Sequence, residues 1–467
     1  MLFSSISFLY YFLPIVLVAY FAVPYRWKNL VLLLSSLGFY FFGEPQYTII
    51  LIFSTIVDYT HSLVIEKKRG QPAAKAALIS SIVLNLSILG FFKYADFFIR
   101  NINAVFSTDF PLLHLSLPLG ISFFTFQTMS YTIDVYRNEA SIQRNPLGLA
   151  TYITLFPQLV AGPIVRYRTV ANEINDRTHS FDLFAYGVRR FAIGLAKKVL
   201  IANQLGELYQ ITLQTDNPTV LFYWIGAIAF SLQIYFDFSG YSDMAIGLGR
   251  IFGFHFLENF NYPYISKSVS EFWRRWHISL GTWFKDYLYI PLGGNRGSTL
   301  IWFRNIFIVW FLTGFWHGAN WNFIFWGLYF GILLILEKAI LQRILNRLPK
   351  LVQHAYVILI VVLGFVIFNN EDLGVIVQTF QGMFGGLHLP FANAETIYYL
   401  RSYAVVILIA VIGATPLMNN LVHRGTKDRV AEKWINFFEP IFLIALLLIV
   451  TGYLVDSSFN PFLYFRF

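Results

Sequence analysis

Long apolar runs alternate with short polar and charged segments along almost the whole chain. A helix needs about 20 apolar residues to cross the hydrocarbon core of a bilayer, so the runs predict membrane-spanning helices. No basic region precedes Ile6 to Val23, and we therefore expect this run to be a retained first span rather than a signal peptide. Several runs are short, which favours tilted, buried or broken helices. The further candidate spans are Leu30 to Phe42, Tyr47 to Val57, Ala77 to Phe92, Leu115 to Ile133, Phe191 to Leu205, Val220 to Phe236, Ile306 to Trp316, Trp321 to Leu336, His354 to Phe368, Tyr403 to Met418 and Ile441 to Val455.

The composition agrees with this pattern and indicates an all-α polytopic membrane protein with about a dozen spans. Hydrophobic residues make up 57% of the chain and charged residues only 13%, far from the averages of soluble proteins. The chain has a net charge of +9, and in a membrane protein such an excess of basic residues usually lies in cytoplasmic loops that face anionic lipid. The charge therefore does not imply that the protein binds nucleic acid. The chain has no cysteine, which excludes disulfides, thiolate metal sites and acyl transfer through a cysteine thioester.

The basic residues predict how the chain is oriented in the membrane. They follow the first, third and fifth runs, whereas the alternate loops carry little positive charge, so the positive-inside rule places the N-terminus outside. Leu149 to Val165 has basic residues on both sides and is broken by Pro157 and Gly162-Pro163, which predicts a re-entrant segment. The residues that set the orientation are Arg26 and Lys28, then Lys67, Lys68, Arg69 and Lys75, then Arg137 and Arg144.

One ionisable residue, His317, stands between two uncharged apolar runs, in the sequence Trp316 to Asn320. At 1.5 Å per helical residue it lies roughly 20 Å beyond Arg304, in the core or outer half of the membrane. A titratable group at that depth is costly and marks a candidate functional site, although a structural hydrogen-bonding role is the alternative. A histidine can remove a proton from a hydroxyl near neutral pH, so His317 is a candidate general base with Trp316 and Asn320 in support.

A second unusual stretch runs from Glu271 to Arg296 and contains a further histidine, His277. Trp273, Trp276, Leu280 and Trp283 recur at helical spacing, which predicts one helix with an aromatic face lying in the membrane interface. Such a helix is either an anchor or a basic cytoplasmic mouth that holds the phosphates of a nucleotide-bearing acyl donor such as a coenzyme A thioester. The donor-binding candidates are Arg274, Arg275, Lys285 and Arg296, with the backbone of Gly293-Gly294.

A third constellation, Gln233 to Met244, places two carboxylates and several hydroxyls among apolar residues. The hydroxyls are explained most simply as hydrogen bonds between membrane helices. Asp237 and Asp243 need partners such as Arg274, a histidine or backbone donors, because a buried carboxylate without a partner is strongly destabilising. We therefore regard these two residues and Tyr241 as candidates for orienting a catalytic histidine or lining a pore.

Together these motifs resemble the membrane-bound O-acyltransferase family, and most strongly its branch that O-acetylates alginate and other bacterial polysaccharides or peptidoglycan. The resemblance runs over nearly the whole chain and predicts one integral membrane domain, 1–467, with a motif core at about 115–340. The residues that carry it are Phe156 to Pro163, Tyr235 to Ala245, Glu271 to His277 and Trp316 to Asn320, together with the opening Met1 to Ser5 and the ending Asn460 to Phe462.

The resemblance implies a helical fold around a tunnel or funnel, with a catalytic histidine at His317 and a second candidate catalytic residue at His277. It implies an acyl thioester such as acetyl-CoA as a cytoplasmic donor substrate, with no bound cofactor and no metal. The acceptor is an extracytoplasmic polysaccharide such as alginate or another cell-surface polymer, and a secreted or membrane-tethered acyltransferase of the same pathway is the expected partner. The expected location is the bacterial inner membrane.

Three functions agree with the residues. The first is transfer of acetyl groups from acetyl-CoA across the membrane onto a polysaccharide. The second is a related enzyme that transfers D-alanine from a carrier protein to teichoic acid. The third is a proton-coupled transporter in which His317, Asp237 and Asp243 form a relay.

Overall fold

The computed structural model describes residues 2–456 and 463, and no strand occurs among them. Seven of the described helices are long and apolar enough to cross a membrane, and the number becomes eight if the bent pair α19 (Ala394–Ser402) and α20 (Ala404–Gly413) counts as one span. The all-α polytopic class is therefore confirmed. The ending Asn460 to Phe462, which contributed to the family resemblance, lies outside the described residues.

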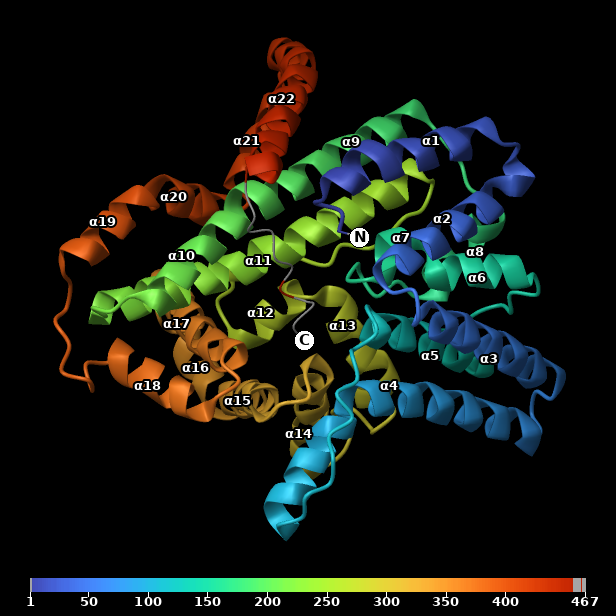
Figure 1. Cartoon of the computed structure of the whole chain (residues 1–467), viewed down its shortest axis with the longest axis horizontal. Coiled ribbons are helices and arrows are strands. Elements are labelled where there is room, and N and C mark those ends of the chain that lie inside the picture. The colour runs from blue at the N-terminus through green and yellow to red at the C-terminus, as the bar shows by residue number, and fades with distance from the viewer. Residues whose placement is uncertain (1, 457–462, 464–467) are drawn as a thin grey trace. The chain divides into compact units, whose positions relative to one another are not determined.

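The chain folds into two compact units, Met1–Phe191 with Tyr241–Leu257 (unit 1) and Ala192–Gly240 with Glu258–Phe467 (unit 2). Two helices, α9 (Phe181–Ala196) and α11 (Val220–Ile251), have residues in both. Unit 1 also contains η1 (Phe8–Phe12), α1 (Leu13–Ala22), η2 (Tyr25–Trp27), α2 (Lys28–Gly43), α3 (Thr48–Lys67), α4 (Pro72–Phe106), α5 (Ile121–Arg137), α6 (Pro146–Thr154), α7 (Phe156–Leu159) and α8 (Tyr167–Asn175), drawn in blue to teal in Figure 1.

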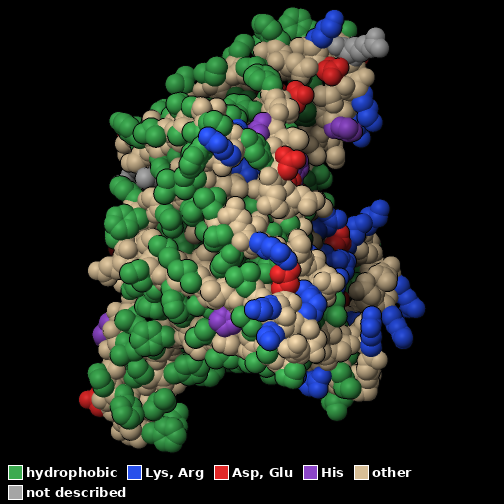
Figure 2. Space-filling model, turned by 90° about the vertical axis from the view of Figure 1, so that its right-hand side faces the viewer, with side chains coloured by type: hydrophobic (Ala, Val, Ile, Leu, Met, Phe, Trp, Pro, Cys, Tyr) green, Lys and Arg blue, Asp and Glu red, His purple; other side chains and the backbone are tan. Residues whose placement is uncertain are grey.

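The remaining helices belong to unit 2. They are η3 (Lys197–Ala202), α10 (Asn203–Gln214), η4 (Pro263–Ile265), α12 (Val269–Arg275), α13 (Ile278–Phe284), η5 (Lys285–Tyr289), α14 (Thr299–His317), α15 (Trp321–Leu336), η6 (Glu337–Leu341), α16 (Gln342–Leu345), α17 (Lys350–Asn369), α18 (Leu373–Met383), α19, α20, α21 (Leu417–Gly425) and α22 (Arg429–Asp456). Hydrophobic side chains occupy much of the surface, and Lys and Arg side chains gather on parts of it (Figure 2), as expected of a protein whose solvent is partly lipid.

Several helices differ in length from the apolar runs that predicted them. Helix α4 has 35 residues and α11 has 32, so both extend well beyond Ala77 to Phe92 and Val220 to Phe236. In α11 the helix continues through Asp237 and Asp243, whose side chains are paired inside the protein. Hydropathy marks such residues as the end of a run, although helical hydrogen bonding continues through them. The run Tyr403 to Met418 was too long at its end, since α20 stops at Gly413.

The segment predicted to be re-entrant is broken and buried. It forms the short helices α6 and α7, and every residue from 151 to 167 is buried. The break falls at Leu155, and Ser36 of α2 accepts a hydrogen bond from the backbone N–H of Phe156 directly after it. The predicted break is therefore confirmed, and re-entry into the membrane stays a prediction.

In unit 2, helices α14 and α15 cross with their backbones in contact. A Cβ atom on Gly314 would lie 2.2 Å from the Phe323 carbonyl oxygen, and one on Gly327 would lie 2.3 Å from the Trp310 carbonyl oxygen. Only glycine permits such an approach, which is a common device where membrane helices pack. Helix α17 packs on α15 as well. This close crossing determines where the last turn of α14 lies.

We expect Gly327→Ala to destabilise unit 2, because its methyl group has no room beside the Trp310 backbone and the two helices must separate. The cost expected for such overpacking is about 1–3 kcal/mol. Thermal unfolding of the purified protein in detergent measures it. Gly452→Ala in α22 is the matched control, since a Cβ there meets nothing within 4 Å and the midpoint should stay unchanged. Equal midpoints for both variants would contradict the close crossing.

A buried ion pair joins η3 to α11 within unit 2. The Lys198 ammonium lies 2.7 Å from Asp237 Oδ1, and both side chains are only 3% exposed. Lys198 also donates to Asn203 Oδ1, and the other Asp237 oxygen accepts the backbone N–H of Leu463. Both charges are thus neutralised and hydrogen-bonded where water cannot solvate them.

Asp237→Ala is expected to destabilise the protein by about 3–5 kcal/mol, because it leaves the Lys198 ammonium buried without its counterion. Replacing both partners at once, Lys198→Met with Asp237→Leu, should restore most of that loss, since no charge is then buried. The unfolding midpoint and the yield of folded membrane protein are the measurements. A double variant as unstable as Asp237→Ala would show that the pair is not the source of the effect.

Candidate active site

His317 is the last residue of α14 and lies in a box of aromatic rings. Its ring is nearly perpendicular to those of Trp326 on α15 and Phe368 on α17, with centroids 5.0 and 5.3 Å apart. The neighbouring Trp316 ring lies 5.0 Å away, and the histidine is 5% exposed. The helix ends here because Gly318 adopts an extended conformation. The tertiary structure therefore buries an ionisable ring among aromatic side chains, and its depth in the membrane stays a prediction.

Asn320, predicted to support His317, caps the next helix. Its side-chain oxygen accepts the backbone N–H of Trp321 at the start of α15, and its amide lies 3.4 Å from Glu371 Oε2. Side chains of this type satisfy the otherwise unpaired N–H groups of a first helical turn. The structure thus gives Asn320 a capping role that shapes the turn after His317.

His277 lies at a break between two short helices. The aromatic spacing predicted one continuous helix, and this is wrong, since α12 ends at Arg275 and α13 begins at Ile278. His277 itself has φ 44°, in the left-handed region that few residues other than glycine adopt. The break forms because the backbone N–H of Ile278 donates to Asn259 O, outside the helix. Trp276 and Trp283 are buried rather than facing an interface.

The His277 side chain is buried and polar at one edge. Its Nδ1 lies 3.2 Å from Asn259 Oδ1, and Phe238 packs edge-on against the ring at 4.6 Å. Burial lowers the pKa of His277 to about 3, so the ring is neutral near pH 7. Its ring centroid is 6.2 Å from that of Trp316. The rings of both candidate histidines therefore contact the ring of Trp316.

Several buried polar atoms near these rings have no hydrogen-bond partner among the described residues. They include the indole nitrogens of Trp273 and Trp326, whose rings are 5.5 Å apart, and Ser239 Oγ. Trp326 also contacts His317. Most buried polar groups in folded proteins are hydrogen-bonded, so exceptions such as these mark candidate contacts for a substrate.

The predicted carboxylates are paired with basic residues that the sequence pattern did not indicate. Asp237 pairs with Lys198 and accepts a backbone N–H, which is one of the expected partner types. Asp243 lies 2.6 Å from Arg190 within unit 1. The expectation of Arg274 as a partner is replaced by these two ion pairs. Tyr241 stacks on Phe3 at 4.6 Å, also within unit 1.

The predicted donor-binding residues divide into two groups. Arg275 forms an ion pair with Glu271 at 2.9 Å and donates to Asn261 O, so its guanidinium stabilises the end of α12. Arg274, Lys285 and Arg296 are exposed, in keeping with a basic mouth. In the Gly293-Gly294 turn, the Gly294 carbonyl accepts the Asn305 amide of α14. This hydrogen bond holds the turn against the helix that ends at His317.

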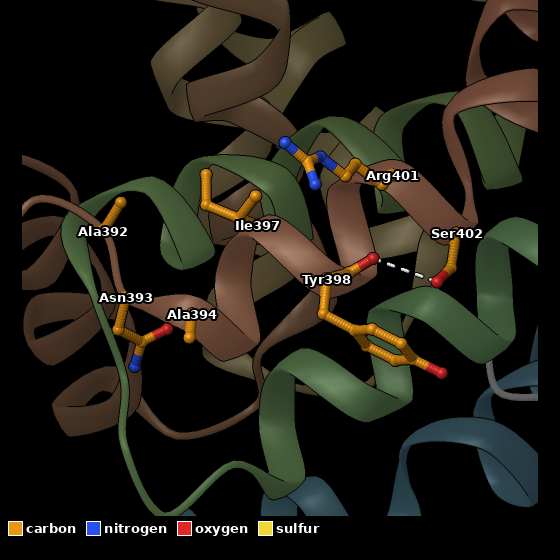
Figure 3. A pocket seen from close by; sticks show the side chains of 7 residues that line it. All are labelled: Ala392, Asn393, Ala394, Ile397, Tyr398, Arg401 and Ser402. Carbon is orange, nitrogen blue, oxygen red and sulfur yellow. Dashed lines mark hydrogen bonds between the residues drawn. The ribbon is translucent and has the colours of Figure 1, made fainter.

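A cavity of about 720 Å³ lies along α19, away from the predicted site residues in sequence. It is lined by Ala392, Asn393, Ala394, Ile397, Tyr398, Arg401 and Ser402, and Ser402 Oγ donates to Tyr398 O across one turn (Figure 3). This cavity is an open groove on one helix and its lining includes neither histidine. Within the part of the chain that the structure describes, no group of three or more His, Asp or Glu side chains could hold a metal ion.

Sequence reasoning missed the residues that surround the two histidines. Asn259, Phe238, Trp326 and Phe368 come from four separate segments of the chain. Asn259 is an amide in a polar loop, and Trp326 and Phe368 are part of apolar runs that predicted only membrane helices. Phe238 lies within the motif Tyr235 to Ala245 but was not itself predicted as a site residue. Only the tertiary structure distinguishes them from their neighbours.

Comparisons with known proteins identify the family of this chain. Residues 82–370 match the membrane-bound O-acyltransferase family. The chain is 39% identical to a probable alginate O-acetylase of Azotobacter vinelandii over all of both chains, and 44% identical to that of Pseudomonas aeruginosa over 82% of this chain and 75% of the relative. It is 34% identical to a peptidoglycan O-acetyltransferase of Helicobacter pylori over 100% of this chain and 98% of the relative. The chain therefore belongs to the membrane-bound O-acyltransferase family and is an O-acyltransferase.

Proposed function

We propose that this protein takes acetyl groups from acetyl-CoA at the cytoplasmic face of the bacterial inner membrane for O-acetylation of an extracytoplasmic polysaccharide. Full-length likeness to enzymes named for alginate and peptidoglycan O-acetylation supports both the acetyl group and the polymer class. The observation that carries the proposal is the buried His317, held by aromatic rings at the end of an apolar helix.

In this reaction His317 acts as general base. It removes the proton from an acceptor hydroxyl, whose oxygen attacks the thioester carbonyl carbon. The carbon–sulfur bond then breaks, and the histidine returns its proton to the departing coenzyme A thiolate. The products are an acetyl ester and the free thiol, and no second protein nucleophile is needed. Rings packed around His317 exclude water, which suppresses the competing hydrolysis of the thioester.

The acceptor hydroxyl belongs either to the polymer or to a partner acyltransferase that finishes the transfer outside. The predicted orientation supports this two-sided scheme, because basic clusters place Arg304 and the segment after Leu336 inside, and the turn after His317 is then approached from the outer side. D-alanyl transfer is the second candidate within the family. The relatives that match the whole chain are named as O-acetylating enzymes and favour acetyl transfer.

We expect His317→Gln to give folded, membrane-inserted protein with acetyl transfer reduced by roughly 10²–10⁴-fold, because an amide cannot accept the proton. Transfer from radiolabelled acetyl-CoA to polymer, measured at equal protein level, gives the result. His423→Gln, at an exposed histidine in α21, is the matched control and should retain full activity. Normal transfer by the His317 variant would remove this residue from the mechanism.

We expect Arg274→Glu to raise the KM for acetyl-CoA more than it lowers kcat. A charged hydrogen bond to phosphate contributes about 1.5–3 kcal/mol, and the lower value suits an exposed guanidinium, so KM should rise roughly tenfold. The assay uses inverted membrane vesicles, in which the cytoplasmic face meets added acetyl-CoA.

Arg343→Glu, at an exposed arginine of α16, is the control for this variant and should leave KM unchanged. Right-side-out vesicles should not use added acetyl-CoA at all, since the donor cannot cross the bilayer. An unchanged KM for Arg274→Glu would assign α12 to anchoring alone.

A further inference from the structure

We propose that Asn259 is a positioning residue that holds the His277 ring with its proton on Nδ1, so that Nε2 meets the substrate as a hydrogen-bond acceptor. The inference rests on the proposed function of His317, since the His277 ring contacts the same Trp316 ring as His317 does. Asn259 lies in the loop between α11 and η4 and belongs to none of the predicted motifs.

The orientation of the Asn259 amide follows from its hydrogen bonds. Its Oδ1 lies 3.1 Å from the backbone N of Ser279 and 2.9 Å from Ser279 Oγ. A backbone N–H can only donate, so the Asn259 atom that faces it is the carbonyl oxygen and not the amide nitrogen. The backbone of Ser279 thus determines which way the side chain of Asn259 points.

The same oxygen determines the tautomer of His277. Asn259 Oδ1 lies 3.2 Å from His277 Nδ1, and a carbonyl oxygen can only accept. Ser279 Oγ also lies 3.4 Å from Nδ1, but it donates its proton to Asn259 Oδ1, so Nδ1 carries a proton of its own. Burial lowers the pKa of His277 to about 3, so near neutral pH the ring holds one proton and Nε2 carries the lone pair.

Asn259 also holds the backbone that presents the ring. Its carbonyl oxygen accepts the N–H of Ile278, while the N–H of Asn261 donates to Arg275 O on the other side of the helix break. Asn259 is 1% exposed and His277 is 2% exposed. One residue thereby secures both the left-handed backbone of His277 and the direction of its ring.

This tautomer determines which hydrogen bonds the Nε2 atom of His277 can make with the substrate. A neutral ring with its lone pair on Nε2 can orient a hydroxyl or amide N–H of the substrate, or accept its proton. It cannot donate from Nε2 to the oxyanion that forms on the thioester carbonyl. His277 is thus assigned to substrate orientation, and oxyanion stabilisation falls to other donors.

The first test uses the full-length protein in lipid bilayers with acetyl-CoA as donor. Asn259→Ala should lower kcat roughly tenfold, the effect of losing one buried hydrogen bond. Asn259→Asp keeps the acceptor oxygen and should recover most of the activity. Its carboxylate raises the pKa of His277, so activity should be lost at a higher pH than in the wild type as the pH falls. Asn261→Ala, at an exposed asparagine two residues away, is the matched control and should leave kcat unchanged.

A double variant distinguishes positioning from a general structural role. In a His277→Gln background, Asn259→Ala should cause no further loss of kcat, because its effect passes through the missing ring. A second tenfold loss there, or full activity of His277→Gln alone, would overturn the inference and leave the case for His317 intact.

A spectroscopic measurement reads the tautomer without any turnover. In protein labelled with ¹⁵N-histidine, the signals lost in His277→Gln belong to His277. They should show a protonated Nδ1 and an unprotonated Nε2, and Asn259→Ala should disturb both. A proton on Nε2 in the wild type would overturn the inference. Because the spectrum needs no substrate, it separates this failure from a failure of acetyl transfer itself.

Discussion

A buried charge in this protein is stabilised by a partner within the chain, since a bilayer core supplies no water to solvate it. Asp237 is paired with Lys198 inside unit 2, and Asp243 is paired with Arg190 inside unit 1. These pairs allow α11 to continue as one helix of 32 residues through a polar motif that would otherwise end it. The same constraint neutralises the carboxylates with basic partners, whereas burial keeps His277 uncharged and His317 is packed among aromatic rings.

The chemistry depends on two local departures from regular helix. Helix α14 ends at His317, and the glycine crossing with α15 places that end among aromatic rings. The break at His277 is held by hydrogen bonds to the loop containing Asn259. Both histidines contact Trp316. Two histidine rings among packed aromatic side chains suit transfer between a thioester and a hydroxyl, because proton removal is required and hydrolysis must be avoided.

The basic residues of the His277 region have unequal roles, although they are adjacent in sequence. Arg275 is held by Glu271 and the Asn261 carbonyl, whereas Arg274 is exposed. On an α-helix, successive side chains point about 100° apart, so neighbours in sequence face different surroundings. A donor site built from this helix would therefore use Arg274 and leave Arg275 to stabilise the helix end.

The sequence alone determined the all-α membrane class and the family, because the length of apolar runs and the order of motifs can be read directly along the chain. It singled out His317 as a candidate because that residue is the one ionisable group between two apolar runs. It could not show that the helix containing Trp276 breaks at His277, since aromatic spacing carries no information about which backbone groups find partners elsewhere. Nor could it find Lys198 as the partner of Asp237, or Asn259 as that of His277. Those pairings join segments distant in the chain, and they form only when packing brings the atoms within hydrogen-bonding distance.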